Sequence, residues 1–219
     1  MLAFLCSCPS PVSYPQALDW QNQLLQQRLS NPDRADVLLL MEHLPVYTLG
    51  RGASLDFIRS PDLPFPLHRV GRGGEVTHHC LGQLVGYPIF NLHRHQTDLH
   101  WYLRQLEQIL IEVIRDYDLP ADRKQGLTGV WIGDVKVAAI GIQVKRWITC
   151  HGFSLNICPE LQGFEAIVPC GIDQYAVGSL QQFKPEISYS EVQQKVIQGF
   201  GQTFQLDFLC QTPWELGLS

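Results

Sequence analysis

Cys170 and Lys136 are the two residues whose settings best suit covalent chemistry. Cys170 stands between Pro169 and Gly171 at the end of an apolar run, where a turn would leave its side chain exposed beside backbone N–H groups. A thiol of ordinary pKa, about 8.5, is mostly protonated at neutral pH, so a reactive one needs a cationic or basic neighbour. A nucleophilic Cys170 therefore requires a partner elsewhere in the chain.

Lys136 is the candidate partner because it interrupts the apolar run 135–140, where the pattern would otherwise place another aliphatic side chain. A lysine at such a position either extends its amine past the sheet edge or points into a site, where burial lowers its pKa and makes it a base. A single cysteine in a cytosolic domain is also more often buried and inert than reactive. Both alternatives stay open on these residues alone.

Two groups of neighbouring histidines and cysteines could in principle bind a metal. Zinc is considered for His78, His79 and Cys80 and for the pair Cys150 and His151, but none of these spacings matches the pairs typical of structural zinc sites, so no metal is expected. Successive strand residues face opposite sides, so only one of the two adjacent histidines can enter a given site.

The glycine-rich segment 71–74 lacks the lysine of a phosphate-binding loop, and 50–52 lacks the continuation of a dinucleotide fingerprint. Nucleotide binding therefore has no motif support. Glycines in this number do allow a backbone to lie against a ligand, although ordinary turns use them equally often.

The composition describes the kind of domain that must position these groups. The 219 residues are 45% hydrophobic and 17% charged, enough for one core, and the net charge of −5 argues against a nucleic-acid binder. No apolar run is long enough to span a membrane, and the first residues lack the basic start of a secretion signal. The seven scattered cysteines are odd in number, which favours free thiols. We expect one cytoplasmic domain over 1–219 that binds neither nucleic acid nor membrane.

Apolar periodicity predicts about three principal helices: 14–30, 98–117 capped by Asp98, and a last one capped by Ser188 with Glu191. Extended segments are expected at 37–41, 46–49, 67–70, 83–92, 129–132, 135–140, 148–157 and 166–168. The proline-rich segment 61–66 is expected to be a loop, and Gly133 with Asp134 to close a hairpin. The fold class is α+β, a single domain with a mixed, mostly antiparallel sheet packed with helices.

Five segments taken together resemble the signature of the lipoyl(octanoyl) transferases. In chain order they are EHLPVYTLG at 42–50, RGGEVTHHCLGQ at 72–83 continued by LVGYP, GDVKVAAIG at 133–141, HGFSLN at 151–156 and VPCG at 168–171. Each alone is weak, but their order and spread over most of the chain are specific. Leu81 departs from the pattern where the family usually has proline, which concerns loop rigidity rather than chemistry.

The resemblance implies the fold of the biotin and lipoate protein ligases and an acyltransferase activity. Such an enzyme moves an octanoyl or lipoyl group from acyl carrier protein to a lysine of a lipoyl domain through a cysteine thioester, the first step of endogenous protein lipoylation. The implied acceptors are the lipoyl domains of 2-oxoacid dehydrogenase complexes and the glycine cleavage H protein. The implied catalytic residues are Cys170 and Lys136, and of the two adjacent histidines His79 matches the family's histidine and is favoured for the site. The implied substrate-binding residues are Arg72, Gly73, Gly74, Glu75, Val76, Thr77, His78, His79, Ala139, Ile140, Gly141, Gly152, Phe153 and Ser154.

Thioester-to-amide transfer is downhill, so no ATP, metal or other cofactor is expected. Backbone N–H groups at Cys170 or along the glycine turns are the expected donors to the oxyanion of each tetrahedral intermediate. Small side chains are expected to line the acyl slot: Ala138, Ala139, Gly141 and Gly152. An acidic carrier would need a local basic patch. The candidates for this patch are Arg51, Arg72, Arg94, Lys145 and Arg146.

Three other functions fit part of this pattern. An ATP-dependent lipoate ligase of the same fold would form an adenylate and would not need Cys170. A non-catalytic module could shelter an acyl chain or dock a lipoyl domain, although it would need neither Cys170 nor Lys136. A thiol hydrolase would use water in place of the acceptor lysine.

Overall fold

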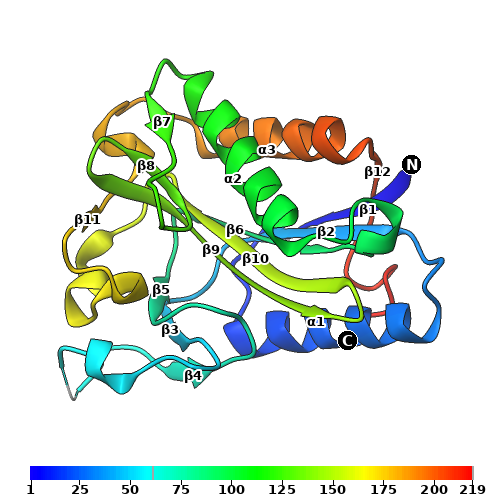
Figure 1. Cartoon of the computed structure of the whole chain (residues 1–219), viewed down its shortest axis with the longest axis horizontal. Helices are drawn as coiled ribbons and strands as arrows, with labels where there is room; N and C mark the ends of the chain where they lie inside the picture. Colours follow the sequence, from blue (N-terminus) through cyan, green and yellow to red (C-terminus); the bar gives the residue numbers. More distant parts are fainter. Residues whose placement is uncertain (61, 219) are drawn as a thin grey trace.

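The computed structural model describes residues 1–60 and 62–218, which form a large mixed sheet with helices on both faces (Figure 1). The described strands of this sheet run in the order β12-β1-β2-β6-β10-β9-β8-β7, and β11 pairs with β9. Their bounds are β1 Leu2–Ser7, β2 Asp36–Met41, β6 Gln83–Ile89, β7 Ala121–Asp122, β8 Val130–Ile132, β9 Val135–Lys145, β10 Ile148–Asn156, β11 Ala176–Val177 and β12 Asp207–Cys210. The pairs β1–β2, β1–β12 and β9–β11 are parallel and the other pairs are antiparallel.

Three α-helices cover the sheet. Helices α2 (Leu99–Arg115) and α3 (Tyr189–Phe204) lie on one face, and α1 (Tyr14–Ser30) lies on the other (Figure 1). Each begins at a side chain that accepts a backbone N–H of the first turn: Ser13 for α1, Asp98 for α2 and Ser188 for α3. The predicted helices and their caps at Asp98 and Ser188 are confirmed.

Strand β2 shows why the sheet needs helices on both faces. All of its side chains are buried, and they alternate between two cores because successive strand residues face opposite sides. Leu38 and Leu40 pack in the core under α2 and α3, whereas Leu39 and Met41 pack in the core under α1. The continuous apolar run 37–41 is therefore typical of a strand buried on both faces.

A small three-stranded sheet lies beside the large one and carries the glycine-rich loop. Its order is β4-β3-β5, with bounds β3 Val46–Leu49, β4 Leu67–Arg69 and β5 Thr77–His79. Its own apolar core includes Tyr47, Val76, Phe164 and Ile167. The glycine-rich loop 71–75 connects β4 to β5, so this sheet determines where the loop lies.

Short 3₁₀ helices connect several of these elements. They are η1 Leu55–Phe57, η2 Leu92–Arg94, η3 Leu161–Ala166, η4 Pro169–Gly171 and η5 Leu180–Gln182. The strand predicted at 166–168 is wrong, because η3 ends at Ala166 and Ile167 makes only an isolated bridge to Ile58. Of the loop predicted at 61–66, Pro61 lies outside the described residues.

Strands β1 and β12 were not predicted. They lie at opposite ends of the chain, and Leu2 to Leu5 pair in parallel with Asp207 to Cys210. Neither segment has the strict alternation from which an isolated strand is recognised. No helix in the described part of the chain is long and apolar enough to cross a membrane.

Candidate active site

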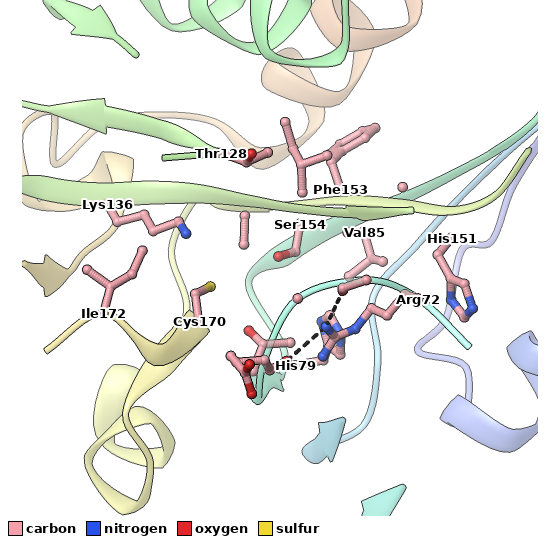
Figure 2. Close-up of a pocket in the computed structure, with 18 of the residues that line it drawn as sticks. Arg72, His79, Val85, Thr128, Lys136, His151, Phe153, Ser154, Cys170 and Ile172 are labelled. Atoms are coloured by element: carbon pink, nitrogen blue, oxygen red, sulfur yellow. Dashed lines mark hydrogen bonds between the residues drawn. The ribbon is translucent and has the colours of Figure 1, made fainter. Parts of the chain in front are cut away.

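A cavity of about 230 Å³ opens between the glycine-rich loop, strands β9 and β10, and the η4 turn. Figure 2 shows Lys136 reaching into it from β9 and Cys170 from the opposite wall. The two residues are 34 positions apart in the sequence. The structure therefore brings the predicted catalytic pair to one cavity.

Cys170 sits on a strained turn. Its φ and ψ of 58° and 15° are left-handed, a conformation that costs a non-glycine residue about 1–2 kcal/mol. Its thiol lines the cavity and is half-buried. The backbone N–H of Cys170 donates to Val76 O at 2.9 Å, and that of Gly171 to Val168 O at 3.1 Å. The expectation that the Cys170 N–H serves as an oxyanion donor is therefore wrong, because this group already holds the turn against the small sheet.

Lys136 is buried between two neighbouring strands, not extended past the sheet edge. It pairs with Trp131 of β8 and with Val177 of β11, and only 6% of it is exposed. Its amine lies 5.1 Å from the centre of a Trp131 ring and has no ion-pair partner within residues 1–60 and 62–218. A Cβ at Gly129 would stand 2.8 Å from Lys136 Cε, so a glycine there makes room for the lysine stem. The open alternative of a surface lysine is excluded.

Arg72 holds the glycine-rich loop from inside. Its Nη2 donates to Thr48 O at 2.7 Å and Thr48 Oγ1 at 2.8 Å, and its Nη1 donates to Gly73 O at 3.0 Å and Glu75 O at 2.9 Å. The side chain is 8% exposed, so its expected place in a surface basic patch for the carrier is wrong. Its role in this structure is to fix the loop that forms one wall of the cavity.

Most of the predicted binding residues line the cavity. They are Arg72, Gly73, Gly74, Glu75, Thr77, His79, Ala139, Ile140, Gly141, Gly152, Phe153 and Ser154. Ala138, expected in the acyl slot, lines a smaller adjoining cavity that also touches Lys136 and Cys170. The wall contributed by β9 and β10 is largely apolar and small, as an acyl chain requires.

His78 and Val76 do not line either cavity, so their expected binding role is not supported by their placement. His78 packs against the rings of Tyr47, Phe65 and Phe164, and its Nδ1 lies 3.2 Å from Val46 O. Val76 is fully buried in the same apolar core. The physical reason is the strand period, since His78 faces away from the side that His79 presents.

His79, by contrast, lies on the cavity wall within a cluster of aromatic rings. It stacks on Tyr14 with ring centres 5.8 Å apart, and its ring meets that of His43 edge-on at 5.6 Å. Burial lowers the pKa of His79 well below its usual value, and the nearby His43 and Arg72 lower it further. Burial also lowers the pKa of His43 to about 4. These side chains are therefore neutral at pH 7.

His151 is a wall residue that the sequence did not assign. Its φ of 57° is left-handed inside β10, and its N–H donates to Gln21 Oε1 at 2.8 Å. Its Nδ1 is buried without a hydrogen-bond partner in the described residues. Burial, followed by the charge of Arg72, lowers the pKa of His151 to about 4.

Other lining residues were not among the predicted binding residues. They are Tyr14, Val85, Tyr87, Gly126, Leu127, Thr128 and Ile172. Tyr14 was counted only as the first apolar residue of a helix. Residues 126–128 belong to an irregular segment whose position depends on tertiary packing, so only a structure could place them here.

The comparisons with known proteins agree with this geometry. A family model described as lipoyl protein ligase A/B catalytic domain matches residues 13–201. An octanoyltransferase of Synechococcus elongatus is 58% identical over 198 residues, covering 90% of this chain and 85% of that protein. One from a Nostoc species is 57% identical, covering 90% of each chain.

The chain belongs to the octanoyltransferase family. The expected family and enzyme class, an acyltransferase, are therefore confirmed. The roles of individual residues in this octanoyltransferase rest on the geometry of the cavity.

Solved structures of related folds confirm the expected fold class. A lipoate-protein ligase A bound with ATP superposes with a TM-score of 0.81 at 16% identity, covering all of this chain and 92% of that one. A bi-partite lipoate protein ligase from Thermoplasma acidophilum gives 0.75 at 18% identity, covering 100% and 90%. Biotin protein ligase from Aquifex aeolicus gives 0.53 at 14% identity, covering 94% and 70%. At these identities the likeness shows the fold alone.

Proposed function

We propose that this octanoyltransferase works through an acyl thioester on Cys170, and that Lys136 transfers protons and stabilises the Cys170 thiolate. The observation that carries the proposal is the buried, unpaired amine of Lys136, which faces the Cys170 thiol across one cavity (Figure 2). Burying an ammonium group without a carboxylate partner lowers the stability of the fold, so a catalytic role best explains why Lys136 is placed here. A thiolate formed at Cys170 would supply the missing charge.

In the first half-reaction, the Cys170 thiolate attacks the thioester carbonyl of the donor. The new C–S bond forms as the bond to the carrier sulfur breaks, and the carrier thiolate takes a proton from Lys136. Lys136 stabilises the attacking thiolate when charged and accepts the thiol proton when neutral. The octanoyl chain then lies along the apolar wall of β9 and β10, where each buried methylene contributes about 0.8 kcal/mol.

In the second half-reaction, a neutral lysine amine of the acceptor attacks the Cys170 thioester. The C–N bond forms, the C–S bond breaks, and the thiolate of Cys170 is regenerated and reprotonated. Gly74 and Glu75 line the cavity, and their N–H groups donate to no described residue, so they are available to an oxyanion. Each well-placed donor is worth about 3–4 kcal/mol to the transition state.

The acyl donor is proposed to be octanoyl-acyl carrier protein, and the acceptors to be the lipoyl domains of 2-oxoacid dehydrogenase complexes and the glycine cleavage H protein. Donors of acyl groups and acceptors of the lipoyl-domain type follow from the family in general terms. The odd number of cysteines and their scatter along the chain support the proposed reducing, cytoplasmic setting. A single domain over 1–219 is consistent with the contiguous sheet.

Intact-mass analysis tests the thioester. Incubation with octanoyl carrier protein without ATP should add one octanoyl group to the wild type and none to Cys170→Ala. The matched control is Cys158→Ala, which replaces another half-buried thiol and should be acylated like the wild type. Adding a lipoyl domain should then discharge the adduct onto lysine. An adduct that survives in Cys170→Ala, a requirement for ATP, or discharge only to free acid contradicts the proposal.

A further inference from the structure

A chain of buried amide groups runs from His79 away from the cavity. His79 Nδ1 lies 2.7 Å from Gln83 Oε1, and Gln83 Nε2 donates to Asn156 Oδ1 at 2.8 Å. Asn156 Nδ2 donates in turn to Gly178 O at 2.9 Å. All three side chains are at most 7% exposed. This series of hydrogen bonds therefore links the cavity wall to the backbone after β11, and its side chains are buried from solvent.

Two backbone carbonyls fix the direction of every hydrogen bond in this chain. Gly178 O can only accept, so Asn156 must present its NH₂ to it and its oxygen to Gln83. His78 O, 3.3 Å from Gln83 Nε2, can also only accept, so it independently orients the Gln83 amide. Gln83 Oε1 is then an acceptor, and His79 must carry its proton on Nδ1.

The other nitrogen of His79 is left as a lone pair. His79 lines the cavity, and its Nε2 makes no hydrogen bond to any residue in the described ranges. A neutral imidazole whose Nδ1 carries the proton offers Nε2 only as an acceptor. The chain therefore places an acceptor of defined orientation on the cavity wall.

We propose that Gln83 and Asn156 are positioning residues that lock His79 in the Nδ1–H tautomer, so that His79 Nε2 binds the N–H of the attacking lysine amine. The inference rests on the proposed function and concerns its second half-reaction. The acceptor holds the amine with its own lone pair directed at the Cys170 thioester carbonyl, which is the orientation that C–N bond formation needs. A histidine of the opposite tautomer would donate its Nε2–H to the lone pair of the amine and so block the attack.

The proton balance of this step is closed. The amine enters neutral, and C–N bond formation leaves its nitrogen positively charged with one proton more than an amide carries; this proton passes along the hydrogen bond to His79 Nε2. The Cys170 thiolate departs as the C–S bond breaks. His79 then returns its proton through water to the Cys170–Lys136 pair, which gave one proton to the carrier thiolate in the first half-reaction, so the products are the amide and the free enzyme.

The surroundings of His79 keep it neutral for this task. Tyr14 faces it from α1, His43 from the segment after β2, Arg72 from the glycine-rich loop, and His78 from the adjacent position of β5. Burial is the largest cause that lowers the His79 pKa, and the neighbouring His43 and Arg72 act in the same direction. The acceptor therefore persists at neutral pH.

The tautomer can be observed directly by ¹⁵N NMR of imidazole-labelled protein, with the His79 signals assigned by their loss in His79→Gln. The wild type should show a protonated Nδ1 and an unprotonated Nε2 for His79. Gln83→Met keeps the side-chain length but removes the acceptor, so the signals should move toward the Nε2–H form. Gln83→Glu keeps an acceptor and should retain the Nδ1–H form. The control is Gln198→Met, an exposed change on α3.

Single-turnover kinetics supply the functional test, because they separate Cys170 acylation from transfer to a lipoyl domain. In Gln83→Met, transfer should slow at least about tenfold more than acylation. In Gln83→Glu, transfer should be largely rescued at neutral pH, with its acidic inflection moved to higher pH because a carboxylate favours protonated His79.

Three results overturn the inference: an Nε2–H tautomer in the wild type, equal slowing of both half-reactions in Gln83→Met, or a tautomer change without slower transfer. A wild type that forms no adduct on Cys170 would instead overturn the proposed function, and the NMR result would stand apart from it.

Discussion

The guanidinium of Arg72, a residue that is 8% exposed, donates two hydrogen bonds to Thr48. One goes to the carbonyl oxygen at 2.7 Å and the other to the hydroxyl oxygen at 2.8 Å. Thr48 belongs to β3, so this contact ties the glycine-rich loop to the small sheet. The same guanidinium binds two carbonyls of the loop itself. One side chain thus sets the position of a cavity wall, and its fork of donors cannot be matched by an ammonium.

Arg72→Lys should therefore lower the free energy of unfolding by about 2–3 kcal/mol, because buried carbonyls lose their donors. Octanoyl transfer should fall as well, since the loop is no longer held. Urea denaturation and a transfer assay measure both effects. Arg69→Lys is the control: Arg69 binds the carbonyls of Gly50 and Ala53 in the segment after β3 but is exposed, and its loss should cost less than about 1 kcal/mol. Equal losses in the two variants would contradict the bracing role.

Gly50→Ala should displace the glycine-rich loop, because a Cβ at Gly50 would stand 1.8 Å from Gly74 O. We expect a loss of about 2–3 kcal/mol in stability and a clear loss of Cys170 acylation. Gly52→Ala is a matched control, since nothing lies within 4 Å of a Cβ at that glycine. Thermal unfolding and acylation rates check the pair. If both variants behave alike, the close approach of Gly50 does not constrain the loop.

Lys136→Met keeps the aliphatic stem and removes the charge. We expect the rate of Cys170 acylation to fall by about 10²–10⁴-fold, the range for loss of a proton-transfer group. The free energy of unfolding should stay the same or rise, because an unpaired buried amine is removed. Rapid-quench mass spectrometry and urea denaturation separate the two quantities, with Lys145→Met at an exposed position as the control. Normal acylation in Lys136→Met would remove this residue from the mechanism.

Lys145 and Arg146 remain candidates for docking an acidic carrier, because both are exposed at the end of the β9–β10 hairpin. Reversing both charges should lower the association rate with the carrier about tenfold at low salt and weaken its dependence on salt. Stopped-flow binding at several ionic strengths measures this effect. Lys195→Glu on α3 is the control, since that lysine is paired with Asp116. Unchanged rates and salt dependence in the double reversal would exclude this patch.

Acid should destabilise the protein through its buried neutral histidines. Burial lowers the pKa values of His43, His78 and His151 from 6.5 to about 4. Between pH 6.5 and 4 the unfolded chain therefore binds more protons than the folded one, so stability is present above pH 6.5 and falls as the pH drops through this window. Burial lowers the pKa of His79 as well, so four such groups give a slope of up to about 5 kcal/mol per pH unit.

Urea denaturation from pH 7.5 to 4 measures this slope. His78→Phe, whose ring would remain among Tyr47, Phe65 and Phe164, should reduce the slope by about one quarter of the histidine contribution. Exposed His100→Gln serves as the reference for a substitution outside the core. A flat profile in the wild type would show that these histidines do not change their protonation on unfolding.

Local patterns were sufficient where local physics decides the structure. The three helices carry their own caps and apolar stripes. Asp98 therefore predicted the start of α2, and Ser188 with Glu191 predicted the start of α3. The apolar run 37–41 predicted a buried strand. The Pro-Cys-Gly turn and the lysine within the apolar run of β9 indicated Cys170 and Lys136 as candidates, and the five family segments indicated the reaction.

The sequence by itself determined the family, the fold class and the identity of the catalytic candidates, because these depend on residue type and on spacings along the chain. Only the tertiary structure shows which side chains face the cavity. In this structure Arg72 points inward and braces the loop, the Cys170 N–H donates to Val76 O, and β1 pairs with β12. Each of these outcomes depends on contacts between segments far apart in the chain, and local periodicity carries no information about such distances.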